Sequence, residues 1–137
     1  MVRAVARGRR GTLLVVVGAS GGVGASTLAA AIAVRAAAAD VPVTLVDGCP
    51  LGGGLDVVLG AEQEGGIRWN DLNRLVGSAD GRALLARLPA AEGVRVLSFA
   101  RDGSQPAPEV AQAVVSALLD ECDLVVVDAS SAGAPWR

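Results

Sequence analysis

The fold is decided by the stretch GASGGVGAST, residues Gly18–Thr27, which directly follows the apolar run TLLVVV at Thr12–Val17. A continuous apolar run rich in valine and leucine is typical of a strand that is buried on both faces of a parallel sheet. The glycines after it permit positive φ angles and bring backbone N–H groups close to a ligand. Ser26 or Thr27 is expected to cap a helix, whose N-terminus favours phosphate. The stretch therefore predicts a phosphate-cradle-type loop between a strand and a helix.

Strands and helices alternate along the rest of the chain. Further strands are predicted at Val43–Val46, Val94–Phe99 and Leu124–Val127. Helices are predicted from the loop to about Ala39, at Trp69–Val76, at Arg82–Leu88 and at Glu109–Glu121. This alternation predicts an α/β fold with an open parallel sheet. In such sheets ligands bind beyond the carboxyl ends of the strands, which is where Gly18, Asp47 and Asp128 are placed.

Composition limits the chemistry. The 137 residues suffice for one domain with a core, and 52% of them are hydrophobic. All 12 basic residues are arginines, and lysine, histidine and tyrosine are absent. Lysine Schiff bases, imidazole bases and histidine metal ligands are therefore excluded. The net charge of −2 gives no electrostatic case for binding nucleic acid, and the spacing of Cys49 and Cys122 matches no zinc motif.

The N-terminal residues 1–11 are rich in arginine and are expected to form a disordered basic lead-in to a domain at 12–137. The apolar run Thr12–Val17 is shorter than the apolar region of a signal peptide. No apolar segment approaches the roughly 20 residues needed to cross a membrane. The sequence is therefore expected to be cytoplasmic, with no transmembrane segment.

The glycine loop permits more than one interpretation. Gly18, Gly22 and Gly24 follow the G-x-x-x-G-x-G spacing of short-chain dehydrogenases, in which Asp47 could hold a ribose. Those enzymes share a catalytic tyrosine and lysine, which this chain lacks, so the alternative is a Rossmann-type fragment that only binds a dinucleotide. A structural turn without a ligand is also open.

The mononucleotide interpretation has more support. The last positions of the P-loop pattern G-x-x-x-x-G-K-[ST] fall on Gly24, Ala25 and Ser26, so that Ser26 offers a hydroxyl to Mg²⁺. Thr27 is then placed for the α-phosphate. The lysine position holds Ala25 and the first glycine position holds Ala19, so the bare pattern fails.

Two acids strengthen this interpretation. Asp128 ends four apolar residues, as in a Walker-B strand whose carboxylate orients Mg²⁺. Asp47 ends the strand predicted at Val43–Val46. Together with the loop, the two acids form a three-point constellation at neighbouring strand ends.

With these residues placed, the chain resembles the MinD/ParA group of deviant P-loop ATPases over about residues 12–128. The K-G-G-V-G-K-[ST]-T loop of that group lies over Ser20–Thr27 without a gap. Its L-V-D-x-D motif lies over Leu45–Cys49, and the Leu-Asp pair and glycine that follow match Leu55-Asp56 and Gly60. The resemblance implies that ATP or ADP is bound with Mg²⁺. It implies nucleotide contacts from Gly21, Gly22, Val23, Gly24, Ala25, Ser26 and Thr27, and Mg²⁺ contacts from Ser26, Asp47 and Asp128.

Three departures from the group predict weak nucleotide binding and negligible hydrolysis. Ser20 replaces the signature lysine, Ala25 the P-loop lysine and Cys49 the second acid. Each lost group of this kind costs on the order of 10²–10³-fold in rate. A slow ATPase that uses an arginine such as Arg68 in place of lysine is the alternative.

Finer similarities concern the branch of the group. The loop G-G-V-G-A-S-T resembles the CpaE/TadZ branch, which is associated with Flp pilus and type II/IV secretion loci. Gly65–Leu72, Leu88-Pro89 and Val94–Ser98 are similar to the actinobacterial septum site-determining group. The resemblance implies a regulatory or localisation protein with partners in cell division or pilus assembly, which recruit it to the membrane or pole, and a homodimer.

The fold class expected is therefore a three-layer P-loop NTPase-like open parallel sheet of the MinD/SIMIBI type, truncated after the Walker-B strand. The chain stops nine residues after Asp128, whereas this fold generally continues with several more strands and helices. A truncated gene product, a domain fragment and a minimal protein are the alternatives. Four parallel strands alone would leave an apolar edge and face exposed, which predicts poor solubility or self-association.

Overall fold

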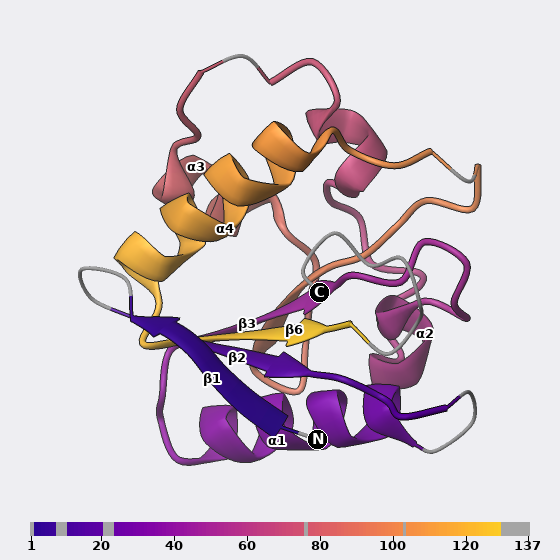
Figure 1. Ribbon diagram of the computed structural model, residues 1–137, viewed down its shortest axis with the longest axis vertical. Coiled ribbons are helices and arrows are strands. Elements are labelled where there is room, and N and C mark those ends of the chain that lie inside the picture. Colours follow the sequence, from indigo (N-terminus) through magenta and orange to yellow (C-terminus); the bar gives the residue numbers. More distant parts are fainter. Residues whose placement is uncertain (1, 8–10, 21–23, 76, 103, 130–137) are drawn as a thin grey trace.

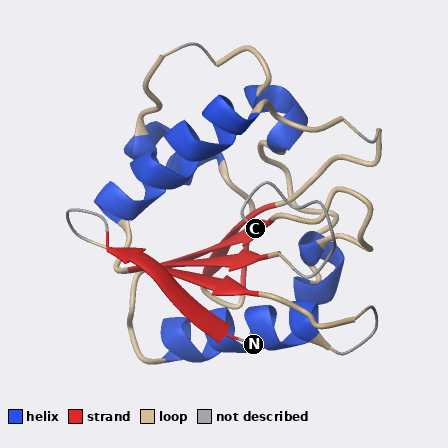
Figure 2. Cartoon of the chain, in the orientation of Figure 1, coloured by secondary structure: helices blue, strands red, loops and turns tan. Residues whose placement is uncertain are grey.

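The chain forms three layers. The computed structural model describes residues 2–7, 11–20, 24–75, 77–102 and 104–129. Figure 1 shows α1 (Ala25–Ala38) below a central sheet, and α3 (Gly81–Arg87) with α4 (Pro108–Glu121) above it. Figure 2 shows the same layers as strands enclosed between helices. The predicted three-layer α/β class is confirmed.

The sheet has six strands in the order β1-β2-β6-β3-β5-β4. Its four central strands run parallel, as predicted, and are β2 (Thr12–Val16), β6 (Leu124–Asp128), β3 (Val43–Asp47) and β5 (Val94–Leu97). Every residue of β3 is buried. Because helices cover both faces, the strands read as continuous apolar runs rather than as an alternation of apolar and polar residues.

Both edges of this parallel set carry a short antiparallel strand. On one edge β1 (Val2–Arg7) pairs with β2. The expectation of a disordered lead-in is therefore wrong for these residues, because β2 offers unpaired backbone N–H and C=O groups that a neighbouring strand satisfies. On the other edge β4 (Ala90–Ala91) pairs with β5. The expectation of an exposed parallel edge is also wrong.

A two-residue turn creates the β4–β5 hairpin. Glu92 and Gly93 have φ angles of 53° and 76°, and Ala91 pairs with Val94 across the turn. Positive φ at both central residues matches the right-handed twist of the flanking strands. Two alanines carry little strand signal of their own, so the turn rather than the strand sequence defines β4.

Each face of the sheet has its own apolar core. On the α1 face, Ala29 and Ala33 are fully buried at the i, i+4 spacing of one helical stripe, packed with Leu45 and Val126. On the opposite face α4 packs with the buried Trp69 and other residues. The largest buried members of that cluster include Trp69, Leu97, Leu118, Val114 and Val125. Neither face of the described sheet is left bare, contrary to the expectation.

The helices begin and end close to the predicted positions, with two differences. The segment predicted as a helix over Trp69–Val76 is a 3₁₀ turn, η1, at Trp69–Leu72, and Val76 lies outside the described residues. The apolar piece that follows the glycine-rich passage Gly48–Gly54 is a short helix, α2 (Leu55–Leu59). None of the helices in the described part of the chain is long and apolar enough to cross a membrane.

The close approach of α3 to α4 gives a stability prediction. A Cβ atom added at Gly81 would lie 2.3 Å from the Ala117 carbonyl oxygen and 2.8 Å from Glu121 Cγ. Gly81→Ala must therefore separate the two helices, and we expect it to destabilise the protein by about 1–3 kcal/mol and to lower the Tm by several degrees. Gly65→Ala is the control, because a Cβ there meets nothing within 4 Å. Equal melting temperatures for the two variants would contradict this packing.

Candidate functional site

Two buried carboxylates lie side by side at the carboxyl ends of the central strands. In the parallel register Asp128 of β6 is opposite Asp47 of β3 and opposite Val16 of β2. Asp47 and Asp128 are only 2% and 1% exposed. The prediction that both acids lie together at the carboxyl ends of neighbouring strands is confirmed. Helix α1 begins at this end of the sheet.

The end of the glycine loop forms the start of α1, which lies at the carboxyl ends of the strands. Gly24 is the N-cap, with φ 80°, and its carbonyl oxygen accepts the Leu28 N–H at 2.8 Å. The expected cap by Ser26 or Thr27 is therefore wrong, because the left-handed conformation before the helix selects glycine. Gly21, Gly22 and Val23 lie outside the described residues.

Ser26 reaches the Walker-B-like acid. Its Oγ donates to Asp128 Oδ2 at 2.5 Å, between residues 102 positions apart in the sequence. A hydroxyl–carboxylate hydrogen bond of this length belongs to the strong, charge-assisted kind. The predicted neighbours Ser26 and Asp128 are thus brought together, while Thr27 is exposed and Ala25 is buried beneath the helix start.

Asp47 anchors the glycine-rich passage that follows β3. Its Oδ1 accepts the Cys49 N–H at 2.9 Å and its Oδ2 accepts the Leu55 N–H at 3.2 Å. Burial raises the pKa of Asp47 from 3.8 to about 6, the two N–H groups oppose the rise, and the carboxylates of Asp128 and Asp56 add to it. The backbone carbonyl of Asp47 also accepts the indole N–H of Trp69 at 2.8 Å. The residue is therefore held from both its backbone and its side chain.

Cys49 occupies the position of the second acid in the resembling group. It is 5% exposed, and its Sγ donates to the Asp128 carbonyl oxygen at 3.5 Å. The Gly48 N–H donates to the same carbonyl at 2.8 Å. Backbone and sulfur together attach the start of the passage to the end of β6.

Arg68, the candidate to replace the missing lysine, forms an ion pair with Asp56 instead. Its Nε lies 3.6 Å from Asp56 Oδ2, with the two side chains 14% and 5% exposed. Its guanidinium also donates to the Glu64 and Ile67 carbonyl oxygens at 3.2 and 3.4 Å. Arg68 therefore pairs with Asp56 and holds the chain before η1.

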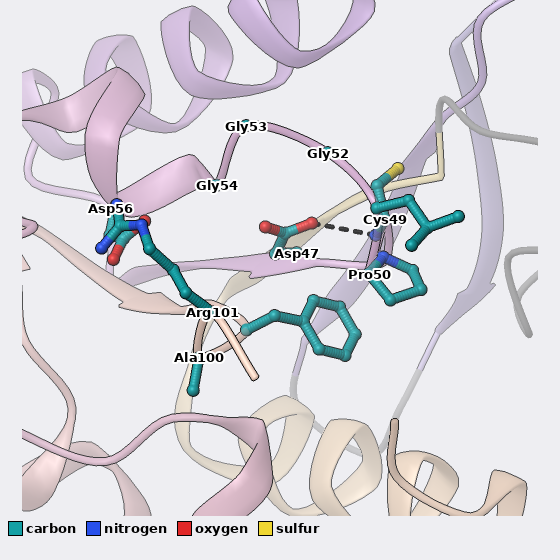
Figure 3. Close-up of a pocket in the computed structure, with 11 residues that line it drawn as sticks. Asp47, Cys49, Pro50, Gly52, Gly53, Gly54, Asp56, Ala100 and Arg101 are labelled. Carbon is teal, nitrogen blue, oxygen red and sulfur yellow. Dashed lines mark hydrogen bonds between the residues drawn. The ribbon is translucent and has the colours of Figure 1, made fainter. Parts of the chain in front are cut away.

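A cavity of about 420 Å³ opens beside Asp47 and Cys49. Figure 3 shows the glycines arching around the Asp47 carboxylate and the Arg101 side chain extended toward Asp56. The lining residues are Asp47, Cys49, Pro50–Gly54, Asp56 and Phe99–Arg101. Among the arginines of the described residues, Arg101 is the one that lines this cavity. Sequence reasoning missed it, although its position just after β5 follows the rule that sites form beyond strand ends.

The donor atoms fit Mg²⁺ only in part. Asp47, Cys49 and Asp128 each offer one ligand atom, and these three atoms lie within 4.8 Å of one another. Mg²⁺ prefers oxygen ligands in octahedral geometry. The oxygens of Ser26, Asp47 and Asp128 suit that preference, whereas the Cys49 sulfur does not.

The raised pKa of Asp47 predicts a pH dependence of stability. Between pH 4 and 6 the folded state holds more protons on this group than the unfolded state, so its contribution to stability falls as the pH rises through that window. Asp47→Asn removes this titrating carboxyl and therefore its pH-dependent contribution to stability. We expect the stability of Asp47→Asn relative to wild type to be more favourable at pH 7.5 than at pH 4.5, measured by urea unfolding. A relative stability that is the same at both pH values would contradict it.

Comparison with known proteins supports the architecture. No family model matches the chain. The uncharacterized proteins MT3760 and Rv3660c of Mycobacterium tuberculosis strains CDC 1551 / Oshkosh and ATCC 25618 / H37Rv are each 39% identical to it over 107 residues. The alignment covers 78% of this chain but 29% of each relative, so the chain spans less than a third of their length. A crystal structure of a ParA family ATPase from Chlorobium tepidum TLS superposes with a TM-score of 0.68 at 21% identity, covering 90% of this chain and 52% of that one. The chain therefore has a ParA/MinD-like P-loop NTPase fold.

Proposed function

We propose that the chain is a nucleotide-binding regulatory domain of MinD/ParA type that binds ATP or ADP weakly and hydrolyses it negligibly. The observation that carries the proposal is the Ser26–Asp128 hydrogen bond at the start of α1. It joins the hydroxyl and the carboxylate that a P-loop site uses around Mg²⁺. The ParA-like fold and the Gly24 cap support the same site.

The proposed nucleotide contacts are those of the loop residues 21–27, with Ser26, Asp47 and Asp128 as the residues that would hold Mg²⁺. When bound with nucleotide, Mg²⁺ supplies charge neutralisation to the phosphate oxygens. The chain itself contributes backbone N–H groups at the helix start and the Ser26 hydroxyl. The Asp47 carboxylate accepts the Leu55 N–H and so fixes the end of the glycine-rich passage, whose residues Pro50–Gly54 line the cavity.

Weak catalysis follows from the shortage of cations. The 137 residues contain no lysine, and Ala25 and Ser20 stand where the resembling group has its two lysines. Phosphoryl transfer depends on cancelling negative charge on the transferring oxygens. Arg68 already pairs with Asp56, so this arginine is not free to replace either lysine.

We also propose the biological process that the chain serves. We place the chain in the CpaE/TadZ-like part of the group, closest to the septum site-determining proteins, with partners in cell division or in pilus and secretion assembly. Both curated relatives come from Mycobacterium tuberculosis, an actinobacterium, which agrees with the actinobacterial side of that resemblance. Homodimer formation and recruitment to the membrane or pole belong to the same proposal. Pilus-assembly ATPase genes beside this gene would favour the pilus role over septum placement.

Titration with a fluorescent ATP analogue, with and without Mg²⁺, tests the site. Ser26→Ala removes the hydroxyl that is proposed to contact Mg²⁺, and a polar contact with a charged group is worth about 1.5 kcal/mol or more. We therefore expect Mg²⁺-dependent binding to weaken by at least about tenfold. Ser116→Ala is the matched control, because Ser116 is exposed on α4. Binding that Ser26→Ala leaves unchanged would overturn the assignment.

Two further outcomes separate the alternatives. Robust turnover that Asp128→Ala abolishes would show an active ATPase and contradict negligible hydrolysis. Binding of NAD(P) without any dependence on Mg²⁺ would instead identify a dinucleotide-binding fragment. Preference for ATP over NAD(P), together with phosphate release close to the buffer rate, is the result expected here.

A further inference from the structure

Three ligand atoms of mixed chemistry converge at the carboxyl end of the sheet. Asp47 ends β3, Cys49 follows it by two residues, and Asp128 ends the neighbouring strand β6. All three side chains are buried, and one ligand atom from each lies within 4.8 Å of the other two. The group therefore combines two carboxylates with one thiol, which is a different donor set from the all-oxygen set that Mg²⁺ prefers.

We propose that Asp47, Cys49 and Asp128 form a binding site for a divalent cation that accepts sulfur ligands, such as Zn²⁺. Zn²⁺ binds thiolate at about 2.3 Å and carboxylate oxygen at about 2.0–2.2 Å, usually in tetrahedral geometry. Those lengths place neighbouring ligand atoms roughly 3.3–3.7 Å apart. The observed group needs to contract by only about 1 Å to reach this arrangement. Three protein ligands leave the fourth position to solvent.

Ser98 gives an independent indication of a ligand at this end of the sheet. Its side chain is 0% exposed, and its Oγ has no hydrogen-bond partner among the residues that the structure describes. Val46 pairs with Leu97, so Ser98 lies opposite Asp47 in the continued register. Residues alternate between faces, which puts Ser98 on the same face as Asp47. A hydroxyl so placed suits an outer hydrogen bond to a metal-bound carboxylate or water.

An ion can reach this group from solvent. Asp47 and Cys49 both line the 420 Å³ cavity beside the glycine-rich passage. Both oxygens of Asp47 accept backbone N–H groups, and each oxygen keeps a further lone pair for a cation. On binding, the Cys49 thiol loses its proton to solvent as the sulfur–metal bond forms, and no oxidant or reductant is needed. The S–H contact with the Asp128 carbonyl is replaced by the metal bond.

Cobalt is the probe that reports sulfur coordination directly. The 137-residue chain is freed of metal with a chelator and titrated with Co²⁺, and the near-ultraviolet charge-transfer absorption from thiolate to cobalt is followed. Cys49→Ser and Cys122→Ser each leave one thiol in the chain. Cys122 is the matched control, because it is equally buried and its sulfur pairs with Thr44 Oγ1 at 3.1 Å instead. Circular dichroism checks that both variants remain folded.

We expect the absorption in wild type and in Cys122→Ser, saturating at one ion per chain, and its loss in Cys49→Ser. Loss of an outer-shell partner alone costs about 10–100-fold in metal affinity. Loss of the sulfur ligand is therefore expected to weaken Zn²⁺, measured by competition with a chromogenic chelator, by at least about 100-fold. Absence of the band from wild type, or its persistence in Cys49→Ser, would overturn the proposal.

Replacing the sulfur ligand by a carboxylate tests whether the sulfur determines which metal ion is bound. Cys49→Asp keeps three ligands but makes them all carboxylates, so we expect it to bind Mg²⁺ or Mn²⁺ better than wild type and Zn²⁺ less well. Unchanged preference between these ions would count against a sulfur ligand. The titrations contain no nucleotide, so this inference stands or fails separately from nucleotide binding at the loop.

Discussion

The parallel pairing of β6 between β2 and β3 is the constraint on which the site depends. Its register sets Asp128 beside Asp47 at the end of two fully covered strands. Burial penalises the charge of Asp47 and raises its pKa, and the neighbouring carboxylate of Asp128 adds to the rise. The structure offsets this cost with the donors that it supplies: the Ser26 hydroxyl for Asp128, and the N–H groups of Cys49 and Leu55 for Asp47. Loop, helix start and glycine-rich passage are therefore arranged around the acids.

The positions of two arginines explain why little positive charge lies at the carboxyl ends of the described strands. Arg68, the first arginine after the passage in the sequence, forms an ion pair with Asp56 and donates to three backbone carbonyls. Arg101 lines the cavity but is exposed, where water weakens its attraction for an anion. This end of the sheet thus offers hydroxyl, thiol, carboxylate and backbone donors, a set that favours holding a ligand over driving transfer of charge.

The central part of the fold could be predicted because its signals are local. The apolar runs of β2 and β6 and the alanine stripe of α1 each specify an element and its burial. The parallel topology then places the acids at the strand ends side by side. The strand β1 could not be predicted, because its pairing depends on a free edge rather than on its arginine-rich sequence. The sequence predicts a cap at Ser26 or Thr27 instead of Gly24, because it does not reveal which residue takes a positive φ. The partner of Arg68 and the contact of the Cys49 sulfur with Asp128 connect residues that only the tertiary structure brings together.

Trp69 links two strand ends through both of its N–H groups. Its backbone N–H donates to the Ser98 carbonyl at 3.0 Å, and its indole N–H donates to the Asp47 carbonyl at 2.8 Å. The indole is fully buried, and its ring centroid lies 6.1 Å from that of Phe99, which lines the cavity. Indole emission depends on burial and on the hydrogen bond of the ring nitrogen, so the fluorescence of this residue reports on the end of β3. Trp69 is consequently an intrinsic optical probe of the end of β3, and in a Trp136→Phe variant its emission can be followed without a label.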